Sequence, residues 1–286
     1  MKCFTVTKGC TNRFRCLDLI KENGWDPHFV CDTKKQSVNL TRLGVDRSSI
    51  FIRNSSRDDG ITGVSRARDF TVNNLMPRDE WCIWIDDNVS CLTGLRPRWS
   101  EDKLDFNSGH NWRKRFTTIL NPEEIKWYID QTIKRAEDVG TIFCGFATEE
   151  NYYFRANRWQ QFGYCRTQFA LYKNDGSTWF PFDTMVWEDG YKSMDVVARY
   201  GQIVINRHMK PVKPQFEKGG IGSFDERLPH LQDNCSRLVE MFPGLVKYPS
   251  KGTTYGTDAS QFHLTFAKRS VNTVNQWRRE NGYAKD

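Results

Sequence analysis

The segment of residues 80–89, Glu-Trp-Cys-Ile-Trp-Ile-Asp-Asp-Asn-Val, constrains the fold of this chain more than any other. Its consecutive apolar and aromatic residues, Trp81–Ile85, indicate a central strand buried on both faces. Asp86, Asp87 and Asn88 follow at once, and adjacent carboxylates are tolerated most easily when a divalent cation or sugar hydroxyls lie between them. Because ligands of open α/β sheets gather at the carboxyl ends of strands, we expect a ligand site here. The alternative is an Asp-Asn turn with solvated acids.

Composition places the chain among ordinary globular proteins. It has 286 residues, of which 38% are hydrophobic and 14% aromatic, enough to fill a sizeable core. No apolar run approaches the length needed to span a bilayer, and residues 1–6 are typical of a first strand rather than a signal peptide. We therefore expect no membrane partner and a protein that acts in a cytoplasm. The nine cysteines show no Cys-x-x-Cys pair, which favours reduced, mostly buried thiols.

The formal charge of +7 favours a polyanionic partner such as nucleic acid. Lys and Arg are also the usual solubilising residues of a folded surface, so the charge alone leaves both interpretations open. No helix-turn-helix or zinc-finger pattern is present. If the chain meets DNA, we expect it to do so as an enzyme acting on a substrate.

The N-terminal residues predict a βαβ unit, with strands at about 3–7 and 27–32 around a helix at about 13–22. Thr7, Lys8 and Asp32 then lie at the strand ends, where a nucleotide would bind. The loop lacks both the Gly-x-Gly-x-x-Gly fingerprint and the phosphate-loop pattern, so neither a dinucleotide fold nor a phosphate-loop ATPase is supported. The alternative is an unspecialised α/β start.

A helix that Ser65 could cap is expected to run to about Leu75, with Arg66 and Arg68 in its first turn. Cations at a helix N-terminus oppose the helix dipole. Their position suggests a bound anion, plausibly a diphosphate, because guanidinium groups fit phosphate oxygens. The alternative is a pair of surface arginines.

Two segments combine aromatic and basic residues as a phosphate-tracking, base-stacking surface requires. An insertion whose tryptophans fill the core would have the same composition. The residues of these segments predicted to contact nucleic acid are Trp112, Arg113, Lys114, Arg115, Arg158 and Trp159.

The second half predicts further elements around the same site. A strand at about 164–172 followed by the turn signal Asn174-Asp175-Gly176 predicts a hairpin beside the site. Glu188 and Asp189 then open a helix that runs to about Tyr200, where a general base would be needed, although acids in a first turn also serve as helix caps.

Two features of the C-terminal part are weaker. The basic, glycine-containing segment 210–222 could act as a lid over a phosphate donor. His263 could supply a further metal ligand, although a histidine in an apolar strand is more often buried and hydrogen-bonded.

Taken in order, these motifs resemble one family. A βαβ opening, a helix with Arg66 and Arg68, an apolar strand ending in Asp-Asp-Asn, a hairpin, and Glu188-Asp189 before a helix are similar to the nucleotide-diphosphate-sugar transferases of the GT-A fold. The resemblance covers residues 1 to about 200. In that family an acidic strand end holds Mn²⁺ or Mg²⁺ on the donor diphosphate.

The resemblance implies a single GT-A-like, Rossmann-related α/β domain over residues 1–286. Its sheet is expected to be mixed, mostly parallel and flanked by helices, with an acceptor-side hairpin and basic loop insertions. Residues 1–90 would form the half that binds the nucleotide-sugar. Residues 91–286 would form the acceptor half, with a C-terminal lid and tail.

The resemblance also assigns roles to the acids. Asp86 and Asp87 would hold the metal and the donor, Asn88 replaces the final acid of the family motif, and His263 becomes a more attractive ligand for that reason. Arg66 and Arg68 would add positive charge at the departing diphosphate. On the acceptor side, Asp189 is expected to act as the base and Glu188 to orient the acceptor, which implies an inverting reaction.

Within this fold the chain is similar to phage-type DNA glycosyltransferases, which decorate hydroxymethylated pyrimidines. The implied donor is a UDP-sugar, the implied acceptor is 5-hydroxymethylcytosine in DNA, and the implied compartment is a host cytoplasm. One alternative is a GT-A transferase that acts on a polysaccharide, glycolipid or protein. A second is a non-enzymatic nucleic-acid-binding protein whose acids merely end a strand and a helix.

Overall fold

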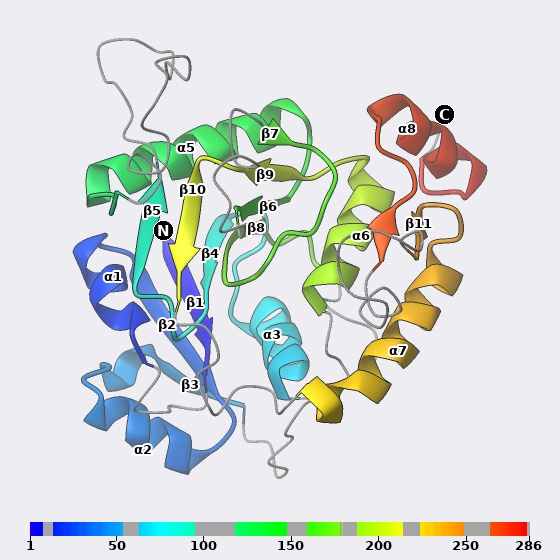
Figure 1. The fold of residues 1–286 in the computed structure, drawn as a ribbon. Coiled ribbons are helices and arrows are strands. Elements are labelled where there is room, and N and C mark those ends of the chain that lie inside the picture. Colours follow the sequence, from blue (N-terminus) through cyan, green and yellow to red (C-terminus); the bar gives the residue numbers. More distant parts are fainter. Residues whose placement is uncertain are drawn as a thin grey trace, which may run out of the picture.

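Strand β4 (Trp81–Ile85) lies inside an eight-stranded sheet in the computed structural model, in the order β3-β2-β1-β4-β8-β6-β9-β7 (Figure 1). β1 pairs with it in parallel on one side and β8 antiparallel on the other, so both of its edges are covered. The central, buried strand predicted from the sequence is confirmed. The structure describes residues 1–7, 14–53, 63–94, 118–147, 159–177, 179, 188–213, 224–248 and 264–284.

The N-terminal elements form the predicted βαβ unit. β1 and β2 are parallel over five paired positions, from Lys2 opposite Asp26 to Val6 opposite Val30, and β3 continues the sheet in parallel beside β2. Thr33 caps α2 with a capping box, which ends β2 and starts the helix within a few residues. The elements are β1 (Lys2–Val6), α1 (Cys16–Glu22), β2 (Asp26–Cys31), α2 (Lys34–Arg42), η1 (Arg47–Ser49), β3 (Ile50–Ile52) and α3 (Gly63–Asn74).

The rest of the chain completes the main sheet and adds two small ones. β6 and β9 are parallel, β8 runs antiparallel between β4 and β6, and β7 closes the far edge antiparallel to β9. The sheet is therefore mixed and mostly parallel, as predicted. The elements are β5 (Cys91–Gly94), α5 (Pro122–Asp138), β6 (Phe143–Phe146), β7 (Trp159–Gln160), β8 (Phe169–Lys173), α6 (Glu188–Tyr200), β9 (Val204–Asn206), β10 (Met209–Val212), α7 (Phe224–Met241), β11 (Val246–Lys247), β12 (Thr265–Phe266) and α8 (Val271–Glu280).

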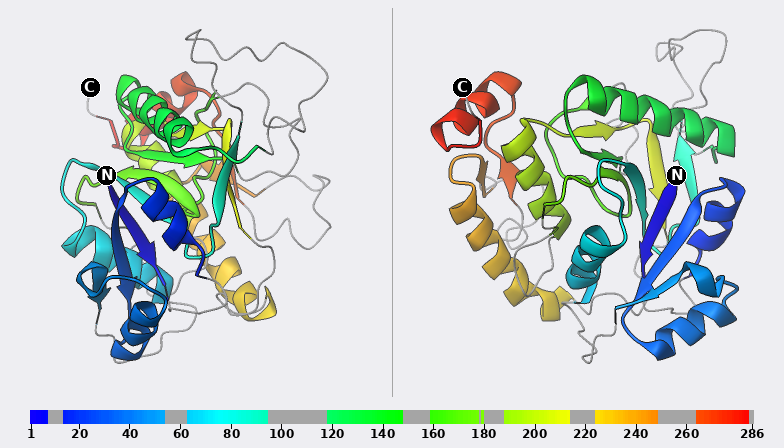
Figure 2. Two further views of the ribbon diagram at one scale, coloured as in Figure 1. Left: turned by 90° about the vertical axis from the view of Figure 1, so that its left-hand side faces the viewer. Right: turned by 180° about the vertical axis from the view of Figure 1, so that it is seen from behind.

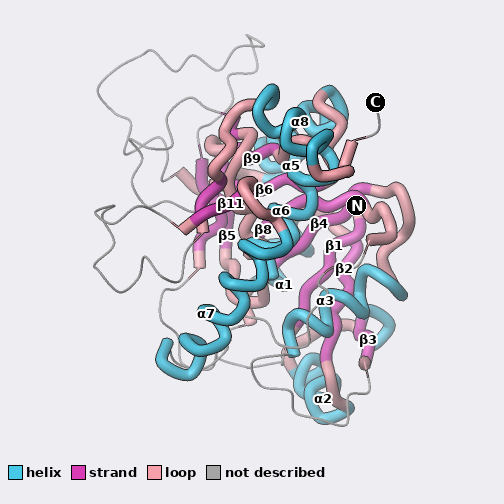
Figure 3. The backbone as a smooth tube through the Cα atoms, turned by 90° about the vertical axis from the view of Figure 1, so that its right-hand side faces the viewer, coloured by secondary structure: helices cyan, strands magenta, loops and turns pink. Residues whose placement is uncertain are grey.

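Helices cover both faces of the main sheet. Side chains alternate between faces along a strand, so Ile83 and Ile85 pack with α1 and α5, whereas Cys82 and Trp84 pack with α3, α6 and α8. Figure 2 shows α1 and α2 on the side of the molecule opposite α7 and α8, and Figure 3 shows α7 along the surface outside α6. No described helix is both long and apolar enough to cross a membrane.

The predicted hairpin at residues 164–176 is wrong. β8 begins at Phe169, and both of its edges are taken by β4 and β6, so no following strand can pair with it. Asn174 to Gly176 do form a turn, with Gly176 at φ +82°. That turn packs against α3 instead of folding back as a ribbon, because the buried Asn174 side chain bonds the helix backbone.

Two smaller expectations are also corrected. α3 begins at Gly63, so Ser65 lies inside the helix and is not its cap, and Arg68 lies in the second turn instead of the first. Residues 210–212 belong to β10, which pairs antiparallel with β5, so this part of the predicted lid is a strand. The remainder of the lid, residues 214–222, lies outside the described residues.

The turn after β8 fixes the C-terminal end of α3. Asn174 Nδ2 donates to the carbonyl oxygens of Val72 and Met76, both at 2.9 Å, and its Oδ1 accepts from the Gly176 amide at 2.9 Å. Asp175 accepts from Arg199 and Tyr200 at the end of α6. The turn therefore holds α3 and α6 together on one face of the sheet.

Replacing Asn174 with Ala is expected to lower the free energy of unfolding by about 3 kcal/mol, because it leaves buried backbone groups without partners. Urea denaturation of the purified variant measures this loss. Asn73→Ala is the matched control, since its amide lies on the exposed face of α3 and bonds only the Asp69 side chain. Equal stabilities for the two variants would contradict the role given to the turn.

Candidate functional site at the carboxyl ends of the strands

The residues that follow β1 and β4 meet at one edge of the sheet. Because the two strands are parallel neighbours, Thr7 and Asp87 emerge side by side, and Thr7 Oγ1 donates to Asp87 Oδ2 at 2.6 Å. The Asp87 carbonyl oxygen accepts from the amides of Arg15 and Cys16 at 2.7 and 3.2 Å. The start of α1 therefore holds in place the backbone of the turn Asp86-Asp87-Asn88, called the acidic turn below.

Arg68 joins this strand end to the start of α6. Its Nη2 lies 3.3 Å from Asp86 Oδ1, and its Nη1 donates to Glu188 Oε1. The Arg68 and Glu188 side chains are each only 7% exposed, whereas that of Asp86 is 30% exposed. The guanidinium carbon also lies 5.9 Å from the ring centre of Trp84. One buried cation thus joins α3 and the end of β4 to α6, which lies about a hundred residues later in the sequence.

The two acids that open α6 differ in their surroundings. Burial raises the pKa of the Glu188 carboxyl from 4.5 to about 6, with Arg68 lowering it and the charges of Asp189 and Asp86 raising it further. Asp189 is partly exposed, and its Oδ1 accepts from the Gly190 amide at 2.8 Å. Among the described residues no other group donates to this carboxylate. Asp189 is therefore the acid of this pair that a ligand can reach.

The acidic turn offers oxygen ligands of the kind that Mg²⁺ and Mn²⁺ prefer. Asp86 and Asp87 supply carboxylates, and Asn88 Oδ1 is a buried oxygen with no hydrogen-bond partner in the described part of the chain. An unpaired buried oxygen beside two carboxylates fits a bound cation. No three Cys, His, Asp or Glu side chains of the described residues form a ready-made metal cluster.

Other predicted site residues have different surroundings. Asp32 follows β2 at the same edge, but its Oδ1 accepts from Arg53 Nε at 2.8 Å. Arg66 is partly buried on α3. Trp159 starts β7, which is separated from β4 by the three strands β8, β6 and β9. Lys8, Trp112, Arg113, Lys114, Arg115, Arg158 and His263 lie outside the described residues.

Sequence analysis missed several residues at this edge. Arg53 follows β3 and Arg207 follows β9, and the strand-end rule that selects Asp32 and Asp86 could have selected them too. A pocket of about 600 Å³ lies along the same edge, away from the acids, at the ends of β6 and β9. Its lining residues are spread from 146 to 269, and no local pattern predicts such a grouping.

The stability of the protein is expected to depend on pH through Glu188. Because the pKa of Glu188 is higher in the folded protein, about 6, than its ordinary value of 4.5, the protonated carboxyl stabilises the fold. That contribution is complete below pH 4.5 and is lost as the pH rises through about 6. The unfolding free energy of the wild type, relative to that of Glu188→Gln, should therefore fall by about 2 kcal/mol across this interval.

Chemical denaturation in a series of buffers measures the difference. Glu240→Gln, at an exposed position on α7, is the control and should show no such step. A difference between wild type and Glu188→Gln that stays constant with pH would contradict the raised pKa.

The comparisons with known proteins add no family to this picture. No protein-family model and no curated protein matches the sequence. The function is therefore inferred from the residues and their geometry.

Proposed function

We propose that this chain is a metal-dependent glycosyltransferase that moves a sugar from a UDP-sugar to a hydroxymethylated pyrimidine in DNA, with 5-hydroxymethylcytosine as the acceptor to test first. The observation that carries the proposal is the contact of Arg68 with both Asp86 and Glu188. It brings the acidic strand end, suited to a donor, next to the helix start that carries the candidate base. A sugar transfer needs the group that binds the donor diphosphate and the base that activates the acceptor on opposite sides of the anomeric carbon.

The donor side of the proposal consists of the carboxyl ends of β1, β2 and β4. Asp86, Asp87 and the amide oxygen of Asn88 would hold Mn²⁺ or Mg²⁺, which supplies Lewis-acid neutralisation of the diphosphate when bound. Thr7 fixes the Asp87 carboxylate through its 2.6 Å hydrogen bond. Asp32, at the next strand end, is held by Arg53 and suits hydroxyl groups of the nucleoside.

The surroundings of Arg68 favour a positioning role over direct binding of the diphosphate. Both of its terminal nitrogens already contact carboxylates, and the side chain is nearly buried. It holds Asp86 and Glu188 at a fixed separation and offsets part of their repulsion. Arg66, two residues nearer the helix start, would add positive charge at the departing diphosphate.

On the acceptor side, Asp189 is proposed as the general base. Its carboxylate would take the proton of the hydroxymethyl group as the acceptor oxygen bonds to the anomeric carbon and the bond from that carbon to the diphosphate breaks. The reaction would release UDP and invert the anomeric centre. The partial exposure of Asp189, beside a buried Glu188, supports this division of roles.

Charge and composition support DNA as the acceptor. The chain carries a formal charge of +7, and the segments with Trp112 to Arg115 and with Arg158 and Trp159 combine rings with cations. A hydroxymethyl group inside a duplex must leave the base stack to reach a base such as Asp189. The aromatic side chains of these segments suit the gap that the base leaves.

UDP and Mn²⁺ together are expected to raise the melting temperature by several degrees, whereas neither alone does so. Ligand at 100 times its dissociation constant adds about 2.7 kcal/mol to the unfolding free energy. Asp87→Asn should lose this shift, measured against its own ligand-free melting temperature by scanning calorimetry. Asp233→Asn, exposed on α7, is the control and should keep it. A full shift in Asp87→Asn would remove the acidic turn from the donor site.

Asp189→Asn is expected to lower the rate of sugar transfer by about 10²- to 10⁴-fold while keeping the stabilisation by UDP and Mn²⁺, because only the proton acceptor is lost. A screen of UDP-sugars against hydroxymethylcytosine DNA, read by nucleoside mass spectrometry, first identifies the donor. The same assay then gives the rates of Asp189→Asn and of the control Asp130→Asn, which is exposed on α5. An undiminished rate in Asp189→Asn would contradict its role, and no new nucleoside mass with any donor would contradict DNA as the acceptor.

A further inference from the structure

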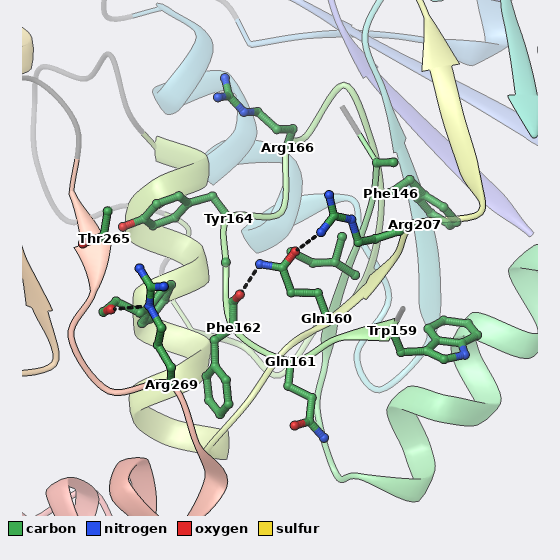
Figure 4. A pocket seen from close by; sticks show the side chains of 14 residues that line it. Phe146, Trp159, Gln160, Gln161, Phe162, Tyr164, Arg166, Arg207, Thr265 and Arg269 are labelled. Atoms are coloured by element: carbon green, nitrogen blue, oxygen red, sulfur yellow. Dashed lines mark hydrogen bonds between the residues drawn. The ribbon is translucent and has the colours of Figure 1, made fainter. Parts of the chain in front are cut away.

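The pocket farther along the same edge of the sheet, at the ends of β6 and β9, is rich in arginine. It has a volume of about 600 Å³, and Arg166, Arg207 and Arg269 line it from three separate parts of the chain (Figure 4). None of the described residues that line it is acidic. Like charges gathered around one cavity repel each other, so the pocket is electrostatically suited to an anion.

Two of these arginines have no carboxylate partner among the described residues. Arg166 is exposed in the segment before β8, and Arg269 Nε donates to the Phe266 carbonyl oxygen at 3.2 Å. Arg207 follows β9, and its Nη1 lies 3.5 Å from Gln160 Oε1. Guanidinium groups that line a cavity fit phosphate oxygens.

Aromatic side chains also line the pocket. Trp159, Phe162 and Tyr164 line the pocket with the arginines. Tyr164 is fixed in place, since its hydroxyl donates to the Leu264 carbonyl oxygen at 2.7 Å and its ring lies 5.4 Å from that of Phe266. Rings beside guanidinium groups are the combination that holds the bases and phosphates of a nucleic-acid strand.

The pocket is joined to the acidic site by short, direct contacts. The Asp86 amide donates to the Gln168 carbonyl oxygen at 2.9 Å, two residues from Arg166. The Cys165 amide donates to Ser193 Oγ at 2.9 Å, and Ser193 Oγ donates to the Asp189 carbonyl oxygen at 2.7 Å. The backbone at Cys165, next to Arg166, packs closely against β6. A Cβ atom added to Gly145 of β6 would lie only 2.9 Å from Cys165 Cα.

We infer that this pocket binds a nucleotide unit of the acceptor DNA strand, with successive strand phosphates on Arg166, Arg207 and Arg269 and a base against the aromatic side chains. The inference rests on the proposed function, to which it adds the surface that would hold DNA beside Asp189. It favours a strand over a free nucleotide, because Arg166 and Arg269 are exposed and can contact successive phosphates.

The test is the double variant Arg166→Ala/Arg269→Ala. Fluorescence anisotropy with a labelled single-stranded oligonucleotide that contains hydroxymethylcytosine is expected to show binding weakened about tenfold or more, with a smaller dependence on salt because phosphate contacts are lost. The control Arg42→Ala/Arg279→Ala removes the same charge at exposed positions on α2 and α8. The Arg166 side chain has no partner among the described residues. The single variant Arg166→Ala should therefore weaken oligonucleotide binding in part and leave the midpoint of urea denaturation unchanged.

The outcomes separate this inference from the proposed function. Loss of oligonucleotide binding together with intact stabilisation by UDP and Mn²⁺ supports the inference, whether or not sugar transfer is detected. Unchanged binding, or a loss equal to that of the control, overturns it even if the wild type transfers sugar. Loss of the UDP and Mn²⁺ stabilisation in the pocket variant also overturns it, because the pocket would then belong to the donor.

Discussion

The arrangement of the site depends on the contacts that the buried guanidinium of Arg68 makes with Asp86 and Glu188. The guanidinium lies between carboxylates contributed by the end of β4 and the start of α6, and it belongs to a third element, α3. Removing one member of such a buried set leaves a charge without compensation, which typically costs about 3–5 kcal/mol. Asn174 holds the C-terminal end of the same helix through the carbonyl oxygens of Val72 and Met76, so α3 is fixed at two points along its length.

The charges at the carboxyl edge of the sheet are divided between two regions. Asp86 and Glu188 contact Arg68, and Asp87 and Asp189 adjoin them in the sequence, so the described acids of this region outnumber the cation that contacts them and favour a bound cation. Farther along the edge, beyond β8, the pocket is lined by arginines and by no described acid. A substrate pair made of a metal-bound nucleotide-sugar and a DNA strand matches this division, since each region attracts the charge that the other repels.

Local sequence signals were sufficient for the framework of the site. The apolar run 81–85 predicted β4, and the acids after it fall at the carboxyl edge because parallel strands end together. Asn121-Pro122 starts α5 with a capping residue and a first-turn proline, which are both local signals. These signals work because a buried strand or a capped helix is specified by residues within a few positions.

The rest depended on contacts between distant residues. Arg68 and Glu188 are 120 positions apart, so no local pattern could pair them, and the arginine was expected to meet phosphate instead. The hairpin prediction failed because a strand pattern does not say which neighbours occupy its edges, and β8 is enclosed by β4 and β6. The pocket arginines escaped notice because each stands alone in the sequence.

The connection between the acidic region and the arginine pocket is made by secondary structure and not by a long loop. Ser193, one turn into α6, accepts a hydrogen bond from the backbone that carries Arg166 and donates one to the backbone of Asp189. Ser193 is fully buried, so water does not compete for either bond. The separation between the arginine pocket and the candidate base is thus set by a helix turn, a serine side chain and the adjoining strand. Rigid supports of this kind hold reacting groups to the fraction of an ångström that a group transfer requires.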